Sequence, residues 1–128
     1  MPFNPERFPT TFRKAFSFPK CERLLRRADF VNTNRSGKRC HMRHFIAIAT
    51  KNELEITRLG VTASKKVGNA VKRNRAKRLI REFYRLNKAR LPEGYDIVVI
   101  AKKGAGCLSF RKAEKELEEI VIKKRVHV

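Results

Sequence analysis

Acidic residues are scarce in this sequence. Asp and Glu number 12 among 128 residues, against 32 Lys and Arg, so the formal charge at pH 7 is +20. A protein that hydrolyses phosphodiesters by itself needs clustered carboxylates for metal ions or a histidine pair for proton transfer, and neither pattern is visible. We therefore predict no catalytic residue and no metal site in the protein. The excess positive charge predicts a polyanionic partner, and nucleic acid is the first candidate.

Long apolar runs and paired cysteines are also missing. There is no stretch of about 18 apolar residues that could cross a membrane, and none placed like a signal peptide. Cys21, Cys40 and Cys107 are odd in number and form no C-x-x-C pair, which favours a reducing compartment. Cys40 and His44 would lie about 13 Å apart on a strand, too far to share a metal ion. We expect free thiols, a cytoplasmic location and no membrane contact.

The length suits one domain, and its beginning differs in composition from the rest. Four of the five prolines and five phenylalanines fall within residues 1–20, a composition that excludes a regular helix. We interpret residues 1–17 as a Pro/Phe-rich extension and residues 18–128 as the domain. The extension is expected to lay a few aromatic rings on the domain, and stacking of these rings on RNA bases is the alternative.

Hydrophobic periodicity predicts the elements of the domain. A short basic amphipathic helix is expected over residues 22–35, ended by Gly37. Strands are expected over residues 40–50, 59–64 and 95–101, the last of them central and buried, and polar residues 51–53 could turn a hairpin between the first two. A final helix begins after Ser109, with Lys112 and Glu116 spaced to pair on its outer face, as are Lys115 and Glu119.

The stretch from residue 65 to residue 90 has eleven Lys and Arg and one acid, Glu82. At about 100° per residue it predicts a helix with two faces. Repulsion between its cations costs an isolated helix about 0.3 kcal/mol per neighbouring pair, which favours a bound polyanion over a merely solvated face. The apolar face holds Ala76, Leu79, Ile80, Phe83 and Leu86, and the cationic face holds Asn74, Arg78, Arg81, Arg85 and Lys88.

Two stretches of the sequence resemble the bacterial ribonuclease P protein. Residues 64–82, SKKVGNAVKRNRAKRLIRE, look like the signature of that family, and residues 91–101, LPEGYDIVVIA, look like its next strand. Shorter matches lie between Phe18 and Phe30, so that the resemblance covers roughly residues 18–124. It implies a single-domain α/β (α+β) sandwich in the order α-β-β-β-α-β-α, with a left-handed β-α-β crossover. The general rule for such connections would predict a right-handed one.

The resemblance also implies the roles of particular residues. The basic helix would meet the catalytic RNA, and Phe30 would belong to the cleft that takes the 5′ leader of precursor tRNA, with Phe45 predicted beside it. Asn34 and Ile48 stand where relatives often have aromatic residues. The residues predicted to bind RNA, including two lysines before the helix where backbone amides favour anions, are Lys65, Lys66, Arg73, Asn74, Arg75, Lys77, Arg78, Arg81 and Arg85.

In family terms, the chain would be the protein subunit of ribonuclease P. It would bind the RNA subunit and the leader, and assist Mg²⁺-dependent removal of the leader, with Mg²⁺ bound mainly by the RNA subunit. A ribosomal-type structural protein is the alternative that composition alone favours, and the signature over residues 64–82 argues against it. A DNA-binding basic-region protein is disfavoured, because no leucine heptads follow the helix.

Removing residues 1–17 is expected to leave a folded domain that still supports cleavage of precursor tRNA. The reason is that the matched region begins at Phe18 and the removed segment has no periodic pattern. Circular dichroism and a cleavage assay of the truncated protein with the RNA subunit would test this. An insoluble or inactive truncation would show that these phenylalanines complete the core or the cleft.

Overall fold

The main elements follow the order α-β-β-β-α-β-α that the family resemblance implies, but the strand expected over residues 40–50 is divided into two, Lys38–His41 and Phe45–Lys51. The computed structural model describes residues 18–127, with only the backbone from residue 121 onward, so the predicted extension over residues 1–17 lies outside the described part. Three-residue helices stand at Lys20–Glu22, Lys65–Val67, Lys88–Arg90 and Ala105–Cys107. The main elements are α2 (Arg27–Ser36), β1 (Lys38–His41), β2 (Phe45–Lys51), β3 (Arg58–Ala63), α3 (Ala70–Asn87), β4 (Tyr95–Ala101) and α4 (Phe110–His127).

The four strands form one sheet in the order β1-β2-β4-β3. β1 and β2 are an antiparallel hairpin, β2 and β4 are antiparallel, and β3 runs parallel to β4. The hairpin considered at residues 51–53 does not form, because β4 lies between β2 and β3. Ile97, Val98 and Val99 of β4 are almost completely buried, and a strand that is apolar on both faces is most stable where both faces are covered.

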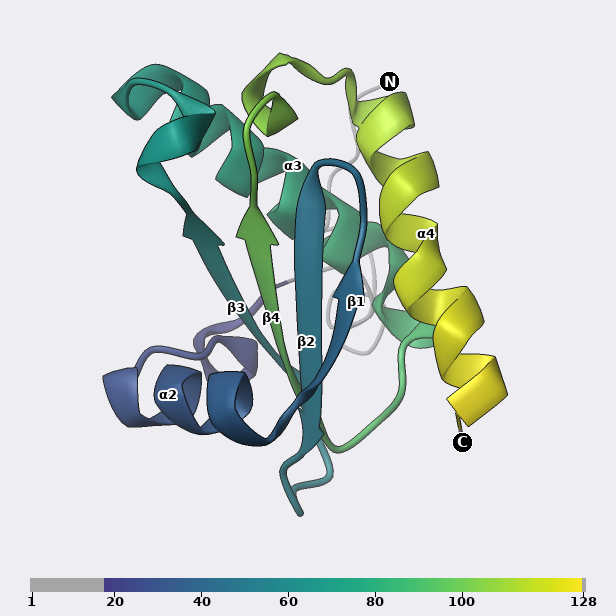
Figure 1. Cartoon of the computed structure of the whole chain (residues 1–128). Helices are drawn as coiled ribbons and strands as arrows, with labels where there is room; N and C mark the ends of the chain where they lie inside the picture. The colour runs from purple at the N-terminus through teal and green to yellow at the C-terminus, as the bar shows by residue number, and fades with distance from the viewer. Residues whose placement is uncertain (1–17, 128) are drawn as a thin grey trace, which may run out of the picture.

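Helix α3 connects the parallel strands β3 and β4. Figure 1 shows both strands running upward with β4 to the right of β3 at their ends, and α3 crossing behind the sheet. A connection behind the sheet that moves to the right is left-handed. The implied left-handed crossover is therefore confirmed, against the general preference for right-handed ones.

The two faces of the sheet have different coverings. Alternate residues of a strand point to opposite faces, and Phe45, Ala47 and Val99 belong to the main core that α3 and α4 cover. Helix α2 packs against β2 and β4 on the other face. None of the helices in the described part of the chain has the length and apolar character needed to cross a membrane.

Helix α2 is shorter than predicted, because it begins at Arg27. The preceding residues run beside the edge strand β3, where the Leu24 amide donates to the Leu59 carbonyl at 2.9 Å. Leu25, expected on the apolar face, is 61% exposed. The helix ends where predicted, since the Gly37 amide donates to the Thr33 carbonyl at 2.8 Å.

Helix α4 begins as predicted, with the Lys112 amide donating to Ser109 Oγ at 3.3 Å. The proposed pair of Lys112 with Glu116 is not formed, because Glu116 turns to the β1–β2 hairpin. Its carboxylate accepts from the His44 backbone amide at 2.9 Å and lies 2.8 Å from His44 Nδ1. This double contact fixes the tip of the hairpin to α4.

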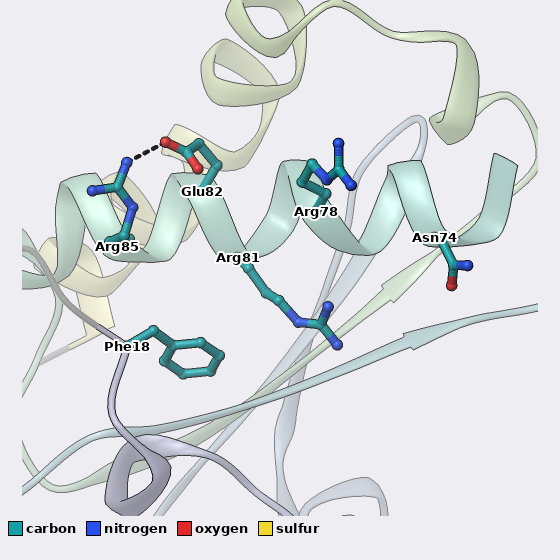
Figure 2. A pocket seen from close by; sticks show the side chains of 6 residues that line it. All are labelled: Phe18, Asn74, Arg78, Arg81, Glu82 and Arg85. Atoms are coloured by element: carbon teal, nitrogen blue, oxygen red, sulfur yellow. Dashed lines mark hydrogen bonds and ion pairs between the residues drawn. The ribbon is translucent and has the colours of Figure 1, made fainter. Parts of the chain in front are cut away.

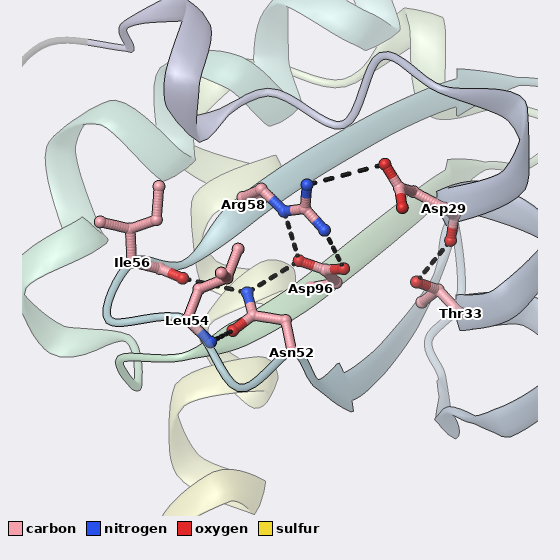
Figure 3. Close-up of polar contacts among 7 residues, drawn as sticks. All are labelled: Asp29, Thr33, Asn52, Leu54, Ile56, Arg58 and Asp96. Atoms are coloured by element: carbon pink, nitrogen blue, oxygen red, sulfur yellow. Dashed lines mark hydrogen bonds and ion pairs between the residues drawn. The ribbon is translucent and has the colours of Figure 1, made fainter.

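A polar network joins α2, the loop after β2 and the start of β4 (Figure 3). Asp96 is buried, and its carboxylate accepts from Arg58 Nε at 2.8 Å, from Arg58 Nη2 at 2.7 Å and from Asn52 at 2.9 Å. Arg58 also lies 3.6 Å from Asp29 of α2. Hydrogen bonding to Asp96 raises the pKa of Arg58 above its usual value, so the guanidinium stays charged. Asn52 holds the loop by accepting from the Leu54 amide at 2.7 Å and donating to the Ile56 carbonyl at 3.0 Å.

Replacing Arg58 by Ala is expected to lower the free energy of unfolding by about 3 kcal/mol, because the buried Asp96 charge loses its partner. Denaturant unfolding followed by circular dichroism measures this. Lys112→Ala, at an exposed site of α4, is the control and should change stability by less than about 0.5 kcal/mol. Equal losses of unfolding free energy for the two variants would show that the Arg58–Asp96 pair contributes no more to stability than an exposed lysine does.

Candidate RNA-binding interface

The start of α3 is defined by a short polar turn. Lys65 and Lys66 lie exposed in the helical turn before it, and Gly68 follows with φ 136°, a backbone conformation that favours glycine. Asn69 caps α3 by accepting from the Lys72 amide at 3.0 Å. The predicted lysines thus flank a helix start, where partial positive charge favours anions.

The apolar face of α3 is largely as predicted. Ala76, Leu79, Ile80 and Phe83 are buried, but Leu86 is 41% exposed, so its assignment is wrong. Tyr84 and Asn87 are buried in its place. Both polar side chains form hydrogen bonds inside the protein, so burying them leaves no polar group without a partner. The Tyr84 hydroxyl lies 3.0 Å from Glu22 Oε1 and 3.1 Å from the Thr57 carbonyl, and Asn87 donates to the Phe83 carbonyl at 3.0 Å.

Tyr84 keeps its proton in this environment. Burial, and then the nearby Glu22 carboxylate, raise its pKa above the usual value. Glu22 in turn forms an ion pair with Lys88 at 3.1 Å. Lys88 was predicted on the free cationic face, but this pairing directs it toward the segment before α2.

The cationic face of α3 borders a hollow of about 350 Å³. In Figure 2 the side chain of Arg81 leaves α3 on the side where Phe18 lies, and Phe18 comes from the segment before α2. Arg85 is ion-paired with Glu82, whereas no carboxylate of the described residues pairs with Arg78 or Arg81, and both are exposed. The residues that line the hollow are Phe18, Asn74, Arg78, Arg81, Glu82 and Arg85.

The remaining predicted residues of α3 do not line this hollow. Arg75 is exposed, but its guanidinium donates to the Leu108 carbonyl at 2.9 Å and thereby ties α3 to the loop after β4. Arg73 and Lys77 are half-buried, and Arg73 Nε has no hydrogen-bond partner among the described residues. The structure therefore brings together Asn74, Arg78, Arg81 and Arg85 from the predicted set.

The predicted leader cleft needs one correction. Phe45 is completely buried, in the core between the sheet, α3 and α4, so it cannot contact RNA. Counting alternate positions along β2 would have placed Phe45 on the core face. Phe30 lies on the α2 side and is half-buried over Gly60, where an added Cβ would come within 2.6 Å of its ring.

Sequence reasoning missed two features of the interface. Phe18 packs against the domain, as expected for the aromatic residues of the first 20 positions, but the sequence did not indicate that its ring also lines the hollow on α3. On the α2 side, the register places His41, Ile46, Ile100 and Thr62 in one row across the four strands, none of them fully buried. The period-two pattern of the strands was the signal that could have identified this row.

Comparison with known proteins decides the family. A family model described as Ribonuclease P matches residues 18–125, a range that includes Phe18 and the α3 residues that line the hollow. The chain belongs to the ribonuclease P protein family. This membership makes it a tRNA-processing subunit and a component of an endoribonuclease, and it disfavours a ribosomal structural role.

Relatives and solved structures agree with this family. The ribonuclease P protein component of Desulforapulum autotrophicum is 48% identical over 83% of this chain and 91% of its own length. That of Geotalea uraniireducens is 47% identical over 89% and 98%. The Staphylococcus aureus RNase P protein structure is similar with a TM-score of 0.75 at 34% identity, covering 84% of this chain and 98% of that one. The structure of the Thermotoga maritima RNase P protein is similar with a TM-score of 0.72 at 34% identity, covering 80% of this chain and 96% of that one.

Replacing Arg78 and Arg81 together by Ala is expected to weaken RNA binding while leaving the fold intact, because both side chains are exposed and lack carboxylate partners among the described residues. The slope of log affinity against log salt should become shallower by about two. Filter binding across a salt series measures both effects. The control Lys112→Ala/Lys115→Ala removes equal charge from α4. An unfolded arginine variant, or equal losses for the two variants, would contradict the assignment of this face.

Proposed function

We propose that this chain binds the catalytic RNA of ribonuclease P through the hollow on α3, and the 5′ leader of precursor tRNA on the α2 side of its sheet. The observation that carries the proposal is the grouping of Asn74, Arg78 and Arg81 around one hollow, with no carboxylate of the described residues paired to either arginine. Guanidinium groups left unpaired at a surface suit phosphate, which they bind through two parallel hydrogen bonds.

The row on the α2 side supports the leader assignment. Its members lie across four strands, a width of about 14 Å at the usual strand spacing. Ile46 and Ile100 give it an apolar centre, and His41 and Thr62 give it polar ends, on the same side of the sheet as the Phe30 ring over Gly60. A surface of this kind suits a single strand whose bases are unpaired. Because this row and the hollow use different residues, one protein can hold both RNAs together.

The hydrolysis itself is assigned to the RNA subunit. Among the residues that the structure describes, no three His, Cys, Asp or Glu side chains gather as metal ligands, so these side chains offer no cluster that fits Mg²⁺. The cations of α3, with Lys65 and Lys66, lower the repulsion between two polyanions, the RNA subunit and the precursor. The protein then acts by bringing the two together.

The protein with precursor tRNA and Mg²⁺ is expected to bind without cutting, and cutting should require the RNA subunit. The protein should matter most at low Mg²⁺, since both the protein and the ion reduce the same repulsion. The experiment compares cleavage of 5′-labelled precursor by RNA alone, protein alone and both, across a Mg²⁺ titration.

Two outcomes would contradict this division of labour. Steady cleavage by purified protein that survives treatment with an RNA-degrading nuclease would place the catalytic groups in the protein. An equal stimulation by protein at all Mg²⁺ concentrations would mean that charge neutralisation is not its contribution.

A further inference from the structure

An aromatic ring stands within the cationic hollow. Phe18 lines it together with Asn74, Arg78 and Arg81, and Figure 2 shows Phe18 and the Arg81 side chain on the same side of α3. Phosphate contacts alone would not need this ring, because the face of an aromatic ring carries partial negative charge and does not attract anions. The ring packs partly against the hydrophobic core, and the part of it that lines the hollow is available for a further contact.

Phe18 is held in place by two neighbouring side chains. Its ring lies 5.0 Å from that of Tyr84, tilted by 59°. The Arg23 guanidinium lies 5.0 Å from the Phe18 ring centroid and donates to the Phe18 carbonyl from Nε at 3.1 Å and from Nη2 at 2.8 Å. The neighbouring bond between Leu24 and Leu59 attaches this segment to β3. The ring is thus already ordered before a ligand arrives, which lowers the entropy cost of binding.

The hollow matches a nucleotide in both size and chemistry. About 350 Å³ is at the lower end of the volumes of small-molecule sites. A nucleobase stacks on an aromatic ring whatever its sequence, while arginines neutralise the neighbouring phosphates. Asn74 adds an amide that can both donate to and accept from a base edge. Bases within a duplex cannot stack on the ring, so the nucleotide must be unpaired.

We propose that the hollow binds one unpaired nucleotide of RNA, with its base stacked on Phe18 and its flanking phosphates paired with Arg78 and Arg81. This inference rests on the proposed function, because it states which kind of nucleotide, an unpaired one, the α3 surface contacts in the RNA that it binds. The RNA subunit is the source that the placement on α3 favours. The leader is the other source of unpaired nucleotides, and the experiment below separates the two.

The sequence contains no tryptophan, so Phe18→Trp in the full chain places a single fluorescent reporter in the hollow. The probes are the RNA subunit, a leader oligonucleotide, a short single-stranded RNA, its duplex, and the same single strand with abasic nucleotides. Val71→Trp is the matched control, since Val71 is 75% exposed on the same helix and does not line the hollow. Stacking of a base on the indole quenches its fluorescence.

The expected result is quenching of the Phe18→Trp protein by the RNA subunit and by the single strand, with little quenching by the duplex or the abasic strand at equal occupancy. Stronger quenching by the leader than by the RNA subunit would overturn the assignment to the RNA subunit. Equal quenching by base-bearing and abasic strands, or an equal response of the Val71→Trp control, would overturn the nucleotide site itself.

A second pair of variants tests the site without a reporter. Phe18→Leu keeps an apolar side chain but loses the ring, and is expected to weaken binding of the RNA subunit about fivefold or more. Phe18→Tyr keeps the ring and should bind within about twofold of the parent, with melting temperatures of both variants measured. If both Phe18 variants bind normally while Arg78→Ala/Arg81→Ala loses affinity, the proposed function stands and the nucleotide site does not.

Discussion

The burial of β4 on both faces is the constraint on which the rest of this structure depends. Ile97, Val98 and Val99 can be covered on both sides only at the centre of the sheet. At the centre, β4 separates β2 from β3, and it runs parallel to β3. A parallel pair needs a crossover, and α3 supplies it. The position of the cationic helix is thus a consequence of where the most apolar strand must lie.

The start of β4 shows how this apolar strand is combined with charge. Asp96 is buried next to apolar residues, where an unpaired charge would be costly. It is stable there because Arg58 and Asn52, from two different segments, donate hydrogen bonds to its carboxylate. The contact of Arg58 with Asp29 extends the network to α2. The same network therefore fixes α2, the helix on one face of the sheet, to strands β3 and β4.

Some cationic residues of α3 contact neighbouring elements of the fold, and others are exposed for binding. Lys88 and Arg75 are drawn into contacts with Glu22 and with the Leu108 carbonyl, which join the helix to its neighbours. Arg78 and Arg81 are exposed on the opposite arc of the helix, and no carboxylate of the described residues pairs with them. Their charge is therefore available to an external partner. A basic sequence motif therefore contains both structural and binding residues, which only their surroundings distinguish.

Sequence by itself determined most of the helical and strand segments, the central position of residues 95–101, the core residues Ala76, Leu79, Ile80 and Phe83, and the family. Local periodicity and a long motif are sufficient for these, because each depends on residues near one another in the chain. Pairing of β3 with β4, the burial of Phe45, the exposure of Leu86 and the joining of Phe18 to the arginine face were decided by tertiary structure. Each of these depends on contacts between segments far apart in sequence, where the competition for the same buried space selects one arrangement.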